Sequence, residues 1–425
     1  MRDGYSDRAA RKPLEIGAAT KEARRAGDLL KPVEPITASH TNDEVAQCFA
    51  ANPTVQNLPV LHAERPMGLI NRGLFDNMMS KPYYRELYGR QSCIAFMDKN
   101  PLVVESDMTI EAVTALAIET GEKVFADGFI LVDKGRYRGV GQVMDLLQAM
   151  TELQARQHRQ LSESIDYAGI IQSSLMKPSR HALTQTFPDG HWVLWRPRDT
   201  VGGDLFHFTE APGGFLAALF DCTGHGVPGA LMTLIADAAF ERAIAQHGHD
   251  DPAALIASMN RRIKHTLGQF DNAPELSPRS AGSDDGLDGL LVRGWIREHR
   301  LVYAGARLPL FRVLAGNPAD CEVLRSDRHG VGYAATPADM RWSNHSISVT
   351  PKDRYYLVSD GILDQIGGPR RIAFGKRRLT RFLVESRTLG MAAQKDAFAE
   401  MFSVYQGNER VRDDLTILGL EWPGD

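Results

Sequence analysis

The sequence predicts an α+β protein in which one long helix joins two structured domains, and three observations lead to this prediction. An arrangement of helix, strand, strand and helix occurs twice between residues 31 and 141. Residues 142–178 contain no glycine or proline before Pro178 except Gly169, which favours a single helix. Short β-rich runs broken by glycine fill residues 187–425. A chain of 425 residues also exceeds the roughly 250 residues at which one core stops growing, so we expect at least two domains.

Composition excludes several classes of protein. With 43% hydrophobic and 24% charged residues the chain is typical of a globular protein. The net charge of -4 provides no overall basic field, so we expect no nucleic acid partner. No apolar stretch approaches the roughly 18 residues of a membrane span, and the first residues are charged, so we expect a cytoplasmic protein without membrane association. The four cysteines are scattered, which favours neither a zinc site nor disulfides.

Residues 1–30 are rich in charged side chains and alanine, and we expect them to form a flexible arm. The repeat in residues 31–141 contains the strand pairs VQNLPVLH with MGLIN and DGFILVDKG with YRGVG, each preceded and followed by a helix-like run. This repeat resembles a pair of CBS modules, which implies an α/β domain with a regulatory or dimerising role. The resemblance also implies a site for an adenine nucleotide, in which Asp145 at the head of the last helix would hold ribose hydroxyls. The corresponding position of the first copy is Leu74, which cannot accept a hydrogen bond, and a purely structural or dimerising role is the alternative.

The helix predicted over residues 142–178 carries an apolar stripe at steps of three and four residues. This stripe is compatible with the seam of a parallel homodimer, and packing of the helix on its own domain is the alternative. The stripe consists of Leu147, Met150, Leu161, Ala168, Ile171 and Leu175.

Four runs in the last part of the chain combine an apolar strand with an aspartate beside glycine or another aspartate. The runs are RPRDTVGGDLFHF, FLAALFDCTGHGVPGALMT, YYLVSDGILDQ and RVRDDLTILGLEW. A carboxylate at the end of a buried strand is costly to desolvate unless a cation or hydrogen-bond donors lie against it. Hard carboxylate oxygens suit Mg²⁺ or Mn²⁺, and two such ions can activate water and bind a phosphoryl oxygen. The pattern therefore predicts a metal-dependent hydrolase.

In this order, GGD, DxTGHGVPGA, AGARLP, SDG and DDxT resemble the PPM family of metal-dependent Ser/Thr phosphatases in its SpoIIE branch, over about residues 192–422. The resemblance implies two antiparallel sheets flanked by helices, the PPM αββα sandwich, with Mn²⁺ or Mg²⁺ at one edge. It implies two ions and, at Asp364, a position for a third; a surface helix cap is the alternative there. The residues to which it assigns catalytic or metal-binding roles are Asp204, Asp221, Asp360, Asp413, Asp414 and the backbone carbonyl of Cys222.

One choice in this assignment stays open, and one group of aspartates is left out of it. The family's usual ending favours Asp413 over Asp414 as the ligand, and both are retained. Asp284, Asp285 and Asp288 lie before the strand LLVRGW, and we expect a solvated loop there rather than further ligands.

The resemblance implies hydrolysis of phosphoserine or phosphothreonine without a covalent enzyme intermediate. The run SDGILDQIGGPRRIAFGKRRL is similar to the SiaA subgroup, which implies a phosphorylated STAS-domain protein as substrate in a bacterial partner-switching pathway. Regulation through the CBS pair and the long helix is part of this prediction. The alternatives are an inactive or latent phosphatase that only binds a phosphoprotein or nucleotide, and a metal-dependent hydrolase of small phosphate esters.

Overall fold

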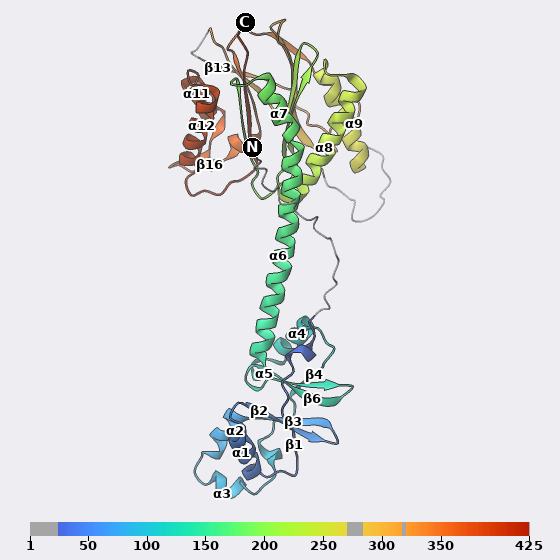
Figure 1. Ribbon diagram of the computed structural model, residues 1–425, viewed down its shortest axis with the longest axis vertical. Helices are drawn as coiled ribbons and strands as arrows, with labels where there is room; N and C mark the ends of the chain where they lie inside the picture. Colours follow the sequence, from blue (N-terminus) through green and yellow to red (C-terminus); the bar gives the residue numbers. More distant parts are fainter. Residues whose placement is uncertain (1–23, 270–283, 317–319, 425) are drawn as a thin grey trace, which may run out of the picture. The chain divides into compact units, whose positions relative to one another are not determined.

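A computed structural model describes residues 24–269, 284–316 and 320–424 (Figure 1). The chain divides into two compact units, Met1–Gln160 and Leu161–Asp425. Within the described ranges, no helix combines the length and apolar character required to cross a bilayer.

The first unit contains two successive copies of one strand arrangement. In the first copy, strand β1 (Ile36–Thr37) runs parallel to β2 (Asn57–His62), which pairs antiparallel with β3 (Arg65–Asn71). In the second copy, β4 (Leu102–Glu105) runs parallel to β5 (Phe129–Asp133), which pairs antiparallel with β6 (Arg136–Gly141). Both hairpins carry a register shift at the same place, which supports a repeated unit.

Helices complete each copy and bury its apolar residues. Helix α1 (Asn42–Ala51) begins at a capping box formed by Thr41 and Glu44, and α2 (Arg72–Met79) begins at Asn71. The remaining helical elements of this unit are α3 (Tyr84–Tyr88), η2 (Cys93–Phe96), α4 (Ile110–Thr120) and α5 (Glu122–Asp127). Each copy has its own hydrophobic core.

The prediction of a flexible arm over residues 1–30 is wrong for residues 24–30. A short helix, η1 (Ala26–Leu29), lies against the second copy, where Ala26 is fully buried. The backbone N–H groups of Ala26 and Gly27 donate to the carbonyls of Met108 and Ser106, at 2.8 and 2.9 Å. Backbone pairing and one small buried side chain hold this segment, and neither is visible in composition. The remainder of the predicted arm lies outside the described residues.

The long helix α6 spans Val143–Leu175 and ends before the predicted residue 178. Met176 interrupts it, and a separate helix α7 (Lys177–Thr186) follows with Pro178 in its first turn. Within a continuous helix, Pro178 could not donate a backbone hydrogen bond, and its ring would collide with the carbonyl four residues earlier. A continuous helix is therefore disfavoured there. Met176, Leu183 and Phe187 lie in the core of the second unit, which therefore begins before residue 187.

The second unit is a sandwich of two five-stranded antiparallel sheets. One sheet has the order β14-β11-β10-β9-β8 and the other β13-β12-β15-β18-β7. The strands of the first are β8 (Asp204–Ala211), β9 (Gly214–Cys222), β10 (Leu287–Trp295), β11 (Arg300–Ala306) and β14 (His345–Ser348). Those of the second are β7 (His191–Arg196), β12 (Leu310–Val313), β13 (Cys321–Leu324), β15 (Arg354–Val358) and β18 (Leu415–Glu421).

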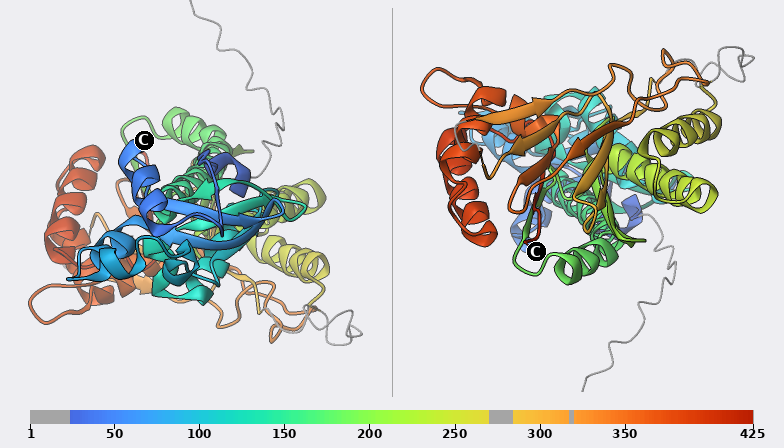
Figure 2. Two further views of the ribbon diagram at one scale, coloured as in Figure 1. Left: turned by 90° about the horizontal axis from the view of Figure 1, so that it is seen from below. Right: turned by 90° about the horizontal axis from the view of Figure 1, so that it is seen from above.

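A pair of helices covers the outer face of each sheet, as the view in the right panel of Figure 2 shows. Helices α8 (Gly226–His247) and α9 (Pro252–Leu267) pack on the first sheet. Helices α11 (Gly375–Glu385) and α12 (Met391–Gln406) pack on the second. The short elements α10 (Asp360–Asp364), β16 (Ile366–Gly367) and β17 (Ile372–Ala373) connect β15 to α11. The order of layers is therefore the predicted αββα sandwich.

Candidate metal centre

Asp204 and Asp221 lie side by side on the first sheet. Asp204 begins β8, Asp221 stands near the end of β9, and the two are direct cross-strand partners, which places both carboxylates on one face. Asp204 is only 1% exposed, and its Oδ2 has no hydrogen-bond partner among the described residues. A buried carboxylate oxygen without a donor is costly unless it is protonated or lies against a cation.

Asp360 and Asp413 flank two strands of the second sheet. Asp360 follows β15 and Asp413 precedes β18, and these strands are neighbours, so both residues lie at the same edge. The backbone N–H of Asp360 donates to Oδ2 of Asp221 at 3.1 Å, which connects the two sheets at this edge. The structure thus brings together the four aspartates from the four sequence runs.

The electrostatics of the cluster are those of carboxylates crowded without a counterion. Burial, with the negative charges of Asp414 and Asp413, raises the pKa of Asp204 to about 8. Burial, with Asp204 and Asp360, raises the pKa of Asp221 well above its usual range. Burial and the charge of Asp413 raise the pKa of Asp360 to about 6. A cation would offset the same desolvation and repulsion.

The donor set fits Mg²⁺ or Mn²⁺ in chemistry, because it consists of hard carboxylate oxygens and includes the unpartnered Oδ2 of Asp204. Within the described ranges, however, no three His, Cys, Asp or Glu side chains converge closely enough to hold an ion as they stand. Mutual repulsion between carboxylates gives a physical reason for this spread.

Asp414 has a different environment from Asp413. Its Oδ1 accepts from the backbone N–H of Arg198 at 2.6 Å and its Oδ2 accepts from that of Gly203 at 2.5 Å. A side chain on Gly202 would collide with this carboxylate, which explains the first glycine of the GGD run. Among the described residues, the carboxylate of Asp413 accepts only from the N–H of Asp414, at 2.9 Å. The arrangement favours Asp413 as the ligand and Asp414 as the residue that holds the GGD loop.

Exchanging each of these two aspartates for asparagine should separate the two roles. We expect Asp414→Asn to lower the free energy of unfolding by about 2 to 3 kcal/mol, because one of two buried N–H groups loses a charged acceptor. Asp413→Asn should change unfolding by less than about 1 kcal/mol while it weakens Mn²⁺ binding by more than about 10-fold. Denaturant unfolding and Mn²⁺ titration check both. Equal stability of the two variants would contradict the assignment.

The backbone of Cys222 also faces the GGD loop. A Cβ atom built on Gly203 would lie 2.7 Å from the carbonyl oxygen of Cys222, so this carbonyl stands directly against the residue before Asp204. The thiol is buried, and burial raises its pKa well above the usual range. Only the carbonyl of Cys222 is therefore suited to a metal.

Gln172 of α6 contacts the same loop, and sequence analysis did not identify it. Its side-chain amide donates to the carbonyl of Gly202 at 2.6 Å and accepts from the N–H of Gly202 at 3.1 Å. It also donates to Thr233 of α8 at 3.2 Å, and it is 3% exposed. A glutamine in a helix has no distinctive sequence signal, so only the structure reveals that α6 holds the GGD loop.

The prediction that Asp288 lies in a loop is wrong. Asp288 is the second residue of β10 and the direct cross-strand partner of Asp221. Its Oδ1 forms an ion pair with Arg307 and accepts from the Tyr333 hydroxyl, both at 3.2 Å. Asp284 and Asp285 do precede β10, where Asp284 accepts from Ala334 and Asp285 from Thr223. The strand extends three residues before LLVRGW because Leu287 pairs with Cys222.

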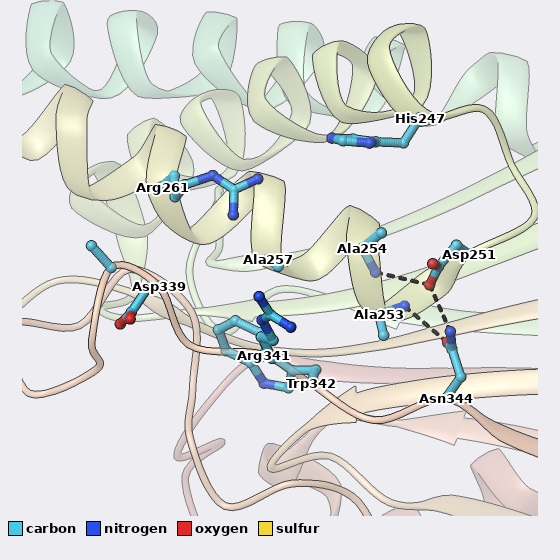
Figure 3. A pocket seen from close by; sticks show the side chains of 11 residues that line it. His247, Asp251, Ala253, Ala254, Ala257, Arg261, Asp339, Arg341, Trp342 and Asn344 are labelled. Atoms are coloured by element: carbon cyan, nitrogen blue, oxygen red, sulfur yellow. Dashed lines mark hydrogen bonds between the residues drawn. The ribbon is translucent and has the colours of Figure 1, made fainter.

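A cavity of about 630 Å³ lies in another part of this unit (Figure 3). It is formed by the end of α8, the first turns of α9 and residues 338–344, with Arg261, Arg341 and Trp342 among its walls. None of the candidate ligands lines it. His247 on its wall is 21 residues along α8 from Gly226 at the metal edge, roughly 30 Å at 1.5 Å per residue. The candidate chemistry is thus at the open edge of the sheets rather than in this cavity.

Comparisons with known proteins concern the second unit. Residues 211–423 match the family model described as Stage II sporulation protein E (SpoIIE). The structure of the SiaA-PP2C domain of Pseudomonas aeruginosa is 33% identical, covers 63% of this chain and 99% of its own, and gives a TM-score of 0.55. The SpoIIE phosphatase domain with a regulatory fragment from Bacillus subtilis is 16% identical over 56% of this chain and 63% of its own, with a TM-score of 0.42. No curated protein matches the chain.

Proposed function

This chain belongs to the SpoIIE family and is a protein serine/threonine phosphatase of the PP2C fold, and from this premise we propose that it dephosphorylates a STAS-domain regulator in a partner-switching pathway. The observation that carries the proposal is the placement of Asp204, Asp221, Asp360 and Asp413 at the same edge of the sandwich. The likeness to the SiaA-PP2C domain at 33% identity supports the phosphatase activity on which this proposal depends.

We assign metal binding to these four aspartates and to the carbonyl of Cys222. Bound there, Mg²⁺ or Mn²⁺ would lower the pKa of water and offset charge on the phosphoryl group. The chain positions its donors beforehand: the N–H of Asp360 orients the carboxylate of Asp221, and Asp414 holds the loop that presents Asp204. Described cysteines do not offer a nucleophile at this edge, since the one present, Cys222, is buried with a raised pKa.

A basic surface between α10 and α12 supports a protein substrate. Lys376 and Arg377 are exposed in the first turn of α11. Arg371 pairs with Glu409 at 2.7 Å, and Arg378 donates to the carbonyls of Ala373 and Phe374. Exposed cations of this kind attract acidic, phosphorylated partners in a salt-dependent way.

The test is phosphate release by the full chain from a phosphoserine STAS protein, from p-nitrophenyl phosphate and from AMP and ATP, each with Mn²⁺, Mg²⁺ or chelator. We expect metal-dependent turnover of the phosphoprotein, with kcat/KM falling as ionic strength rises from about 0.05 to 0.5 M, where the screening length falls several-fold. Preferential turnover of the nucleotides would support a small-ester hydrolase instead. Tight phosphoprotein binding without turnover under any condition would support a binding protein.

For the first unit we propose a CBS pair that dimerises and binds an adenine nucleotide. Asp145 lies in the first turn of α6, where Lys31 contacts it at 2.6 Å. A cavity of about 280 Å³ adjoins the pair, with Arg24 and Gln148 on its wall. In the first copy Leu74 is exposed at the matching position of α2, so one nucleotide site is expected rather than two.

The apolar stripe on α6 supports the dimer. Leu161 is 62% exposed, and Leu147 and Ile171 are also exposed, so these three side chains are not buried within the chain. We expect sedimentation to give a mass of twice the 47.0 kDa of one chain and Leu161→Glu to shift this mass toward that of the monomer.

Nucleotide binding is tested separately. Calorimetric titration with AMP or ATP should detect binding that Asp145→Ala removes. A monomeric wild type, or nucleotide binding unaffected by Asp145→Ala, would refute the corresponding part.

A further inference from the structure

An arginine lies next to the candidate metal centre without belonging to it. Arg307 directly follows β11, and its Nη1 pairs with Asp288 at 3.2 Å. Asp288 is the cross-strand partner of Asp221, on the neighbouring strand of the same sheet. The guanidinium therefore contacts Asp288, the neighbour of the candidate metal ligand Asp221. Because β9 lies between β8 and β10, Arg307 and Asp204 lie on opposite sides of Asp221.

The surroundings of Arg307 fix its position. Its backbone has a φ of +68°, a conformation that non-glycine residues rarely adopt, and its N–H donates to the carbonyl of Asp327 at 2.8 Å. Its Nε donates to the carbonyl of Arg328 at 3.3 Å, and its guanidinium lies 4.6 Å from the ring centroid of Tyr333. The Tyr333 hydroxyl donates to the same oxygen of Asp288 that contacts Arg307. Three contacts, with Asp288, the Arg328 carbonyl and the Tyr333 ring, thus orient the side chain, and the backbone hydrogen bond to Asp327 holds its base.

This arrangement leaves part of the guanidinium available. The side chain is 45% exposed, and no described residue forms a hydrogen bond or ion pair with Nη2. An arginine that served only to neutralise Asp288 would need neither the stacking on Tyr333 nor the unusual backbone conformation. An arginine with two nitrogens fixed and one edge open is well suited to bind the oxygens of a phosphoryl group.

We propose that Arg307 binds the non-bridging phosphoryl oxygens of the substrate, with Asp288 and Tyr333 as the residues that position it. This inference rests on the proposed phosphatase function. It gives the substrate phosphate a protein-borne cation close to the edge at which the aspartates Asp204, Asp221, Asp360 and Asp413 lie. Such a contact would be made with any phosphomonoester, so p-nitrophenyl phosphate and inorganic phosphate are sufficient probes.

The chain offers a closely matched control. Arg300 lies at the opposite end of β11, pairs with Glu298 at 3.1 Å and stacks on Trp295 at 3.8 Å. Arg300→Met therefore removes an ion pair and a cation–π contact from the same strand, away from the metal edge. Arg307→Met and Arg300→Met should lose similar structural contacts and differ only in their effect on phosphate.

The experiment compares the full-length wild type, Arg307→Met, Arg307→Lys and Arg300→Met in Mn²⁺. We expect Arg307→Met to raise KM for p-nitrophenyl phosphate and the inhibition constant of inorganic phosphate by about 10-fold or more, with partial recovery in Arg307→Lys. The rise in melting temperature that inorganic phosphate causes in the presence of Mn²⁺ should disappear in Arg307→Met. The rise caused by Mn²⁺ alone should stay.

Unchanged phosphate constants in Arg307→Met, or an equal change in Arg300→Met, would overturn the inference. Loss of the Mn²⁺ effect itself in Arg307→Met would also overturn it, because the residue would then act through the metal centre. If the wild type hydrolyses no ester, the proposed function fails. The phosphate-dependent change in melting temperature still tests Arg307 in that case, so the two failures are distinguishable.

Discussion

Replacing Asp221 with asparagine is expected to lower metal-dependent phosphatase activity by more than about 100-fold, since loss of residues that only support metal ligands already costs about 10- to 100-fold. The same substitution should stabilise the metal-free protein. Asp221 lies close to Asp204 and Asp360. Its burial and their negative charges raise its pKa well above the usual range. A neutral amide removes this repulsion and can still accept from the N–H of Asp360. We expect the metal-free melting temperature to rise by a few degrees, equivalent to about 1 kcal/mol.

Asp237→Asn is the matched control for this prediction. Asp237 lies on α8, and burial together with Glu241 raises the pKa of its carboxyl, but it has no place in the metal cluster. Activity and the rise in melting temperature with Mn²⁺ should persist in Asp237→Asn and be lost in Asp221→Asn. A folded Asp221→Asn protein that keeps Mn²⁺-dependent turnover would exclude Asp221 as a ligand.

Replacing Gln172 with methionine, which has a similar length, should impair both stability and catalysis. The N–H and carbonyl of Gly202 would lose their partners in a buried environment, which costs about 2 to 4 kcal/mol for two groups. Gly202 is followed by Gly203, whose N–H donates to Asp414, and then by the candidate ligand Asp204. We therefore expect the Mn²⁺ concentration for half-maximal activity to rise by about 10-fold or more, as for other residues that support ligands.

Gln185→Met provides the comparison, because Gln185 is exposed on α7. It should alter neither the melting temperature nor the Mn²⁺ dependence. If Gln172→Met destabilised the protein but left the Mn²⁺ dependence unchanged, the contact would be structural only, and α6 would have no influence on the metal centre through this residue.

The sandwich and the placement of the four aspartates at one edge of it were predictable because their signals are local. Each of the four aspartates lies at one end of an apolar run, with glycine or a second aspartate within three residues, and strand ends meet at sheet edges. The family's usual ending favours Asp413 over Asp414, but the physical reason for this preference was not predictable. It depends on which carboxylate faces the N–H groups of Arg198 and Gly203, some 210 residues earlier in the chain.

The other features that the sequence did not predict correctly have related physical causes. Asp288 was assigned to a loop because aspartates and glycines precede it, whereas pairing with β9 extends the strand to Leu287. The packing of Ala26 and the break of the long helix at Met176 likewise depend on contacts or on backbone geometry that composition does not record. The role of Gln172 requires the position of Gly202, which only the folded chain provides.

The four carboxylates come as two pairs from two different sheets, and this has a consequence for folding. Asp204 and Asp221 are joined by a hairpin, which forms from local contacts, whereas Asp360 and Asp413 require β15 to pair with β18 across more than 50 residues. Neither sheet alone contains a complete set. Catalytic competence would therefore be acquired only at the last step of assembly, when the sheets stack, and an intermediate with one formed sheet would be inactive however native its secondary structure.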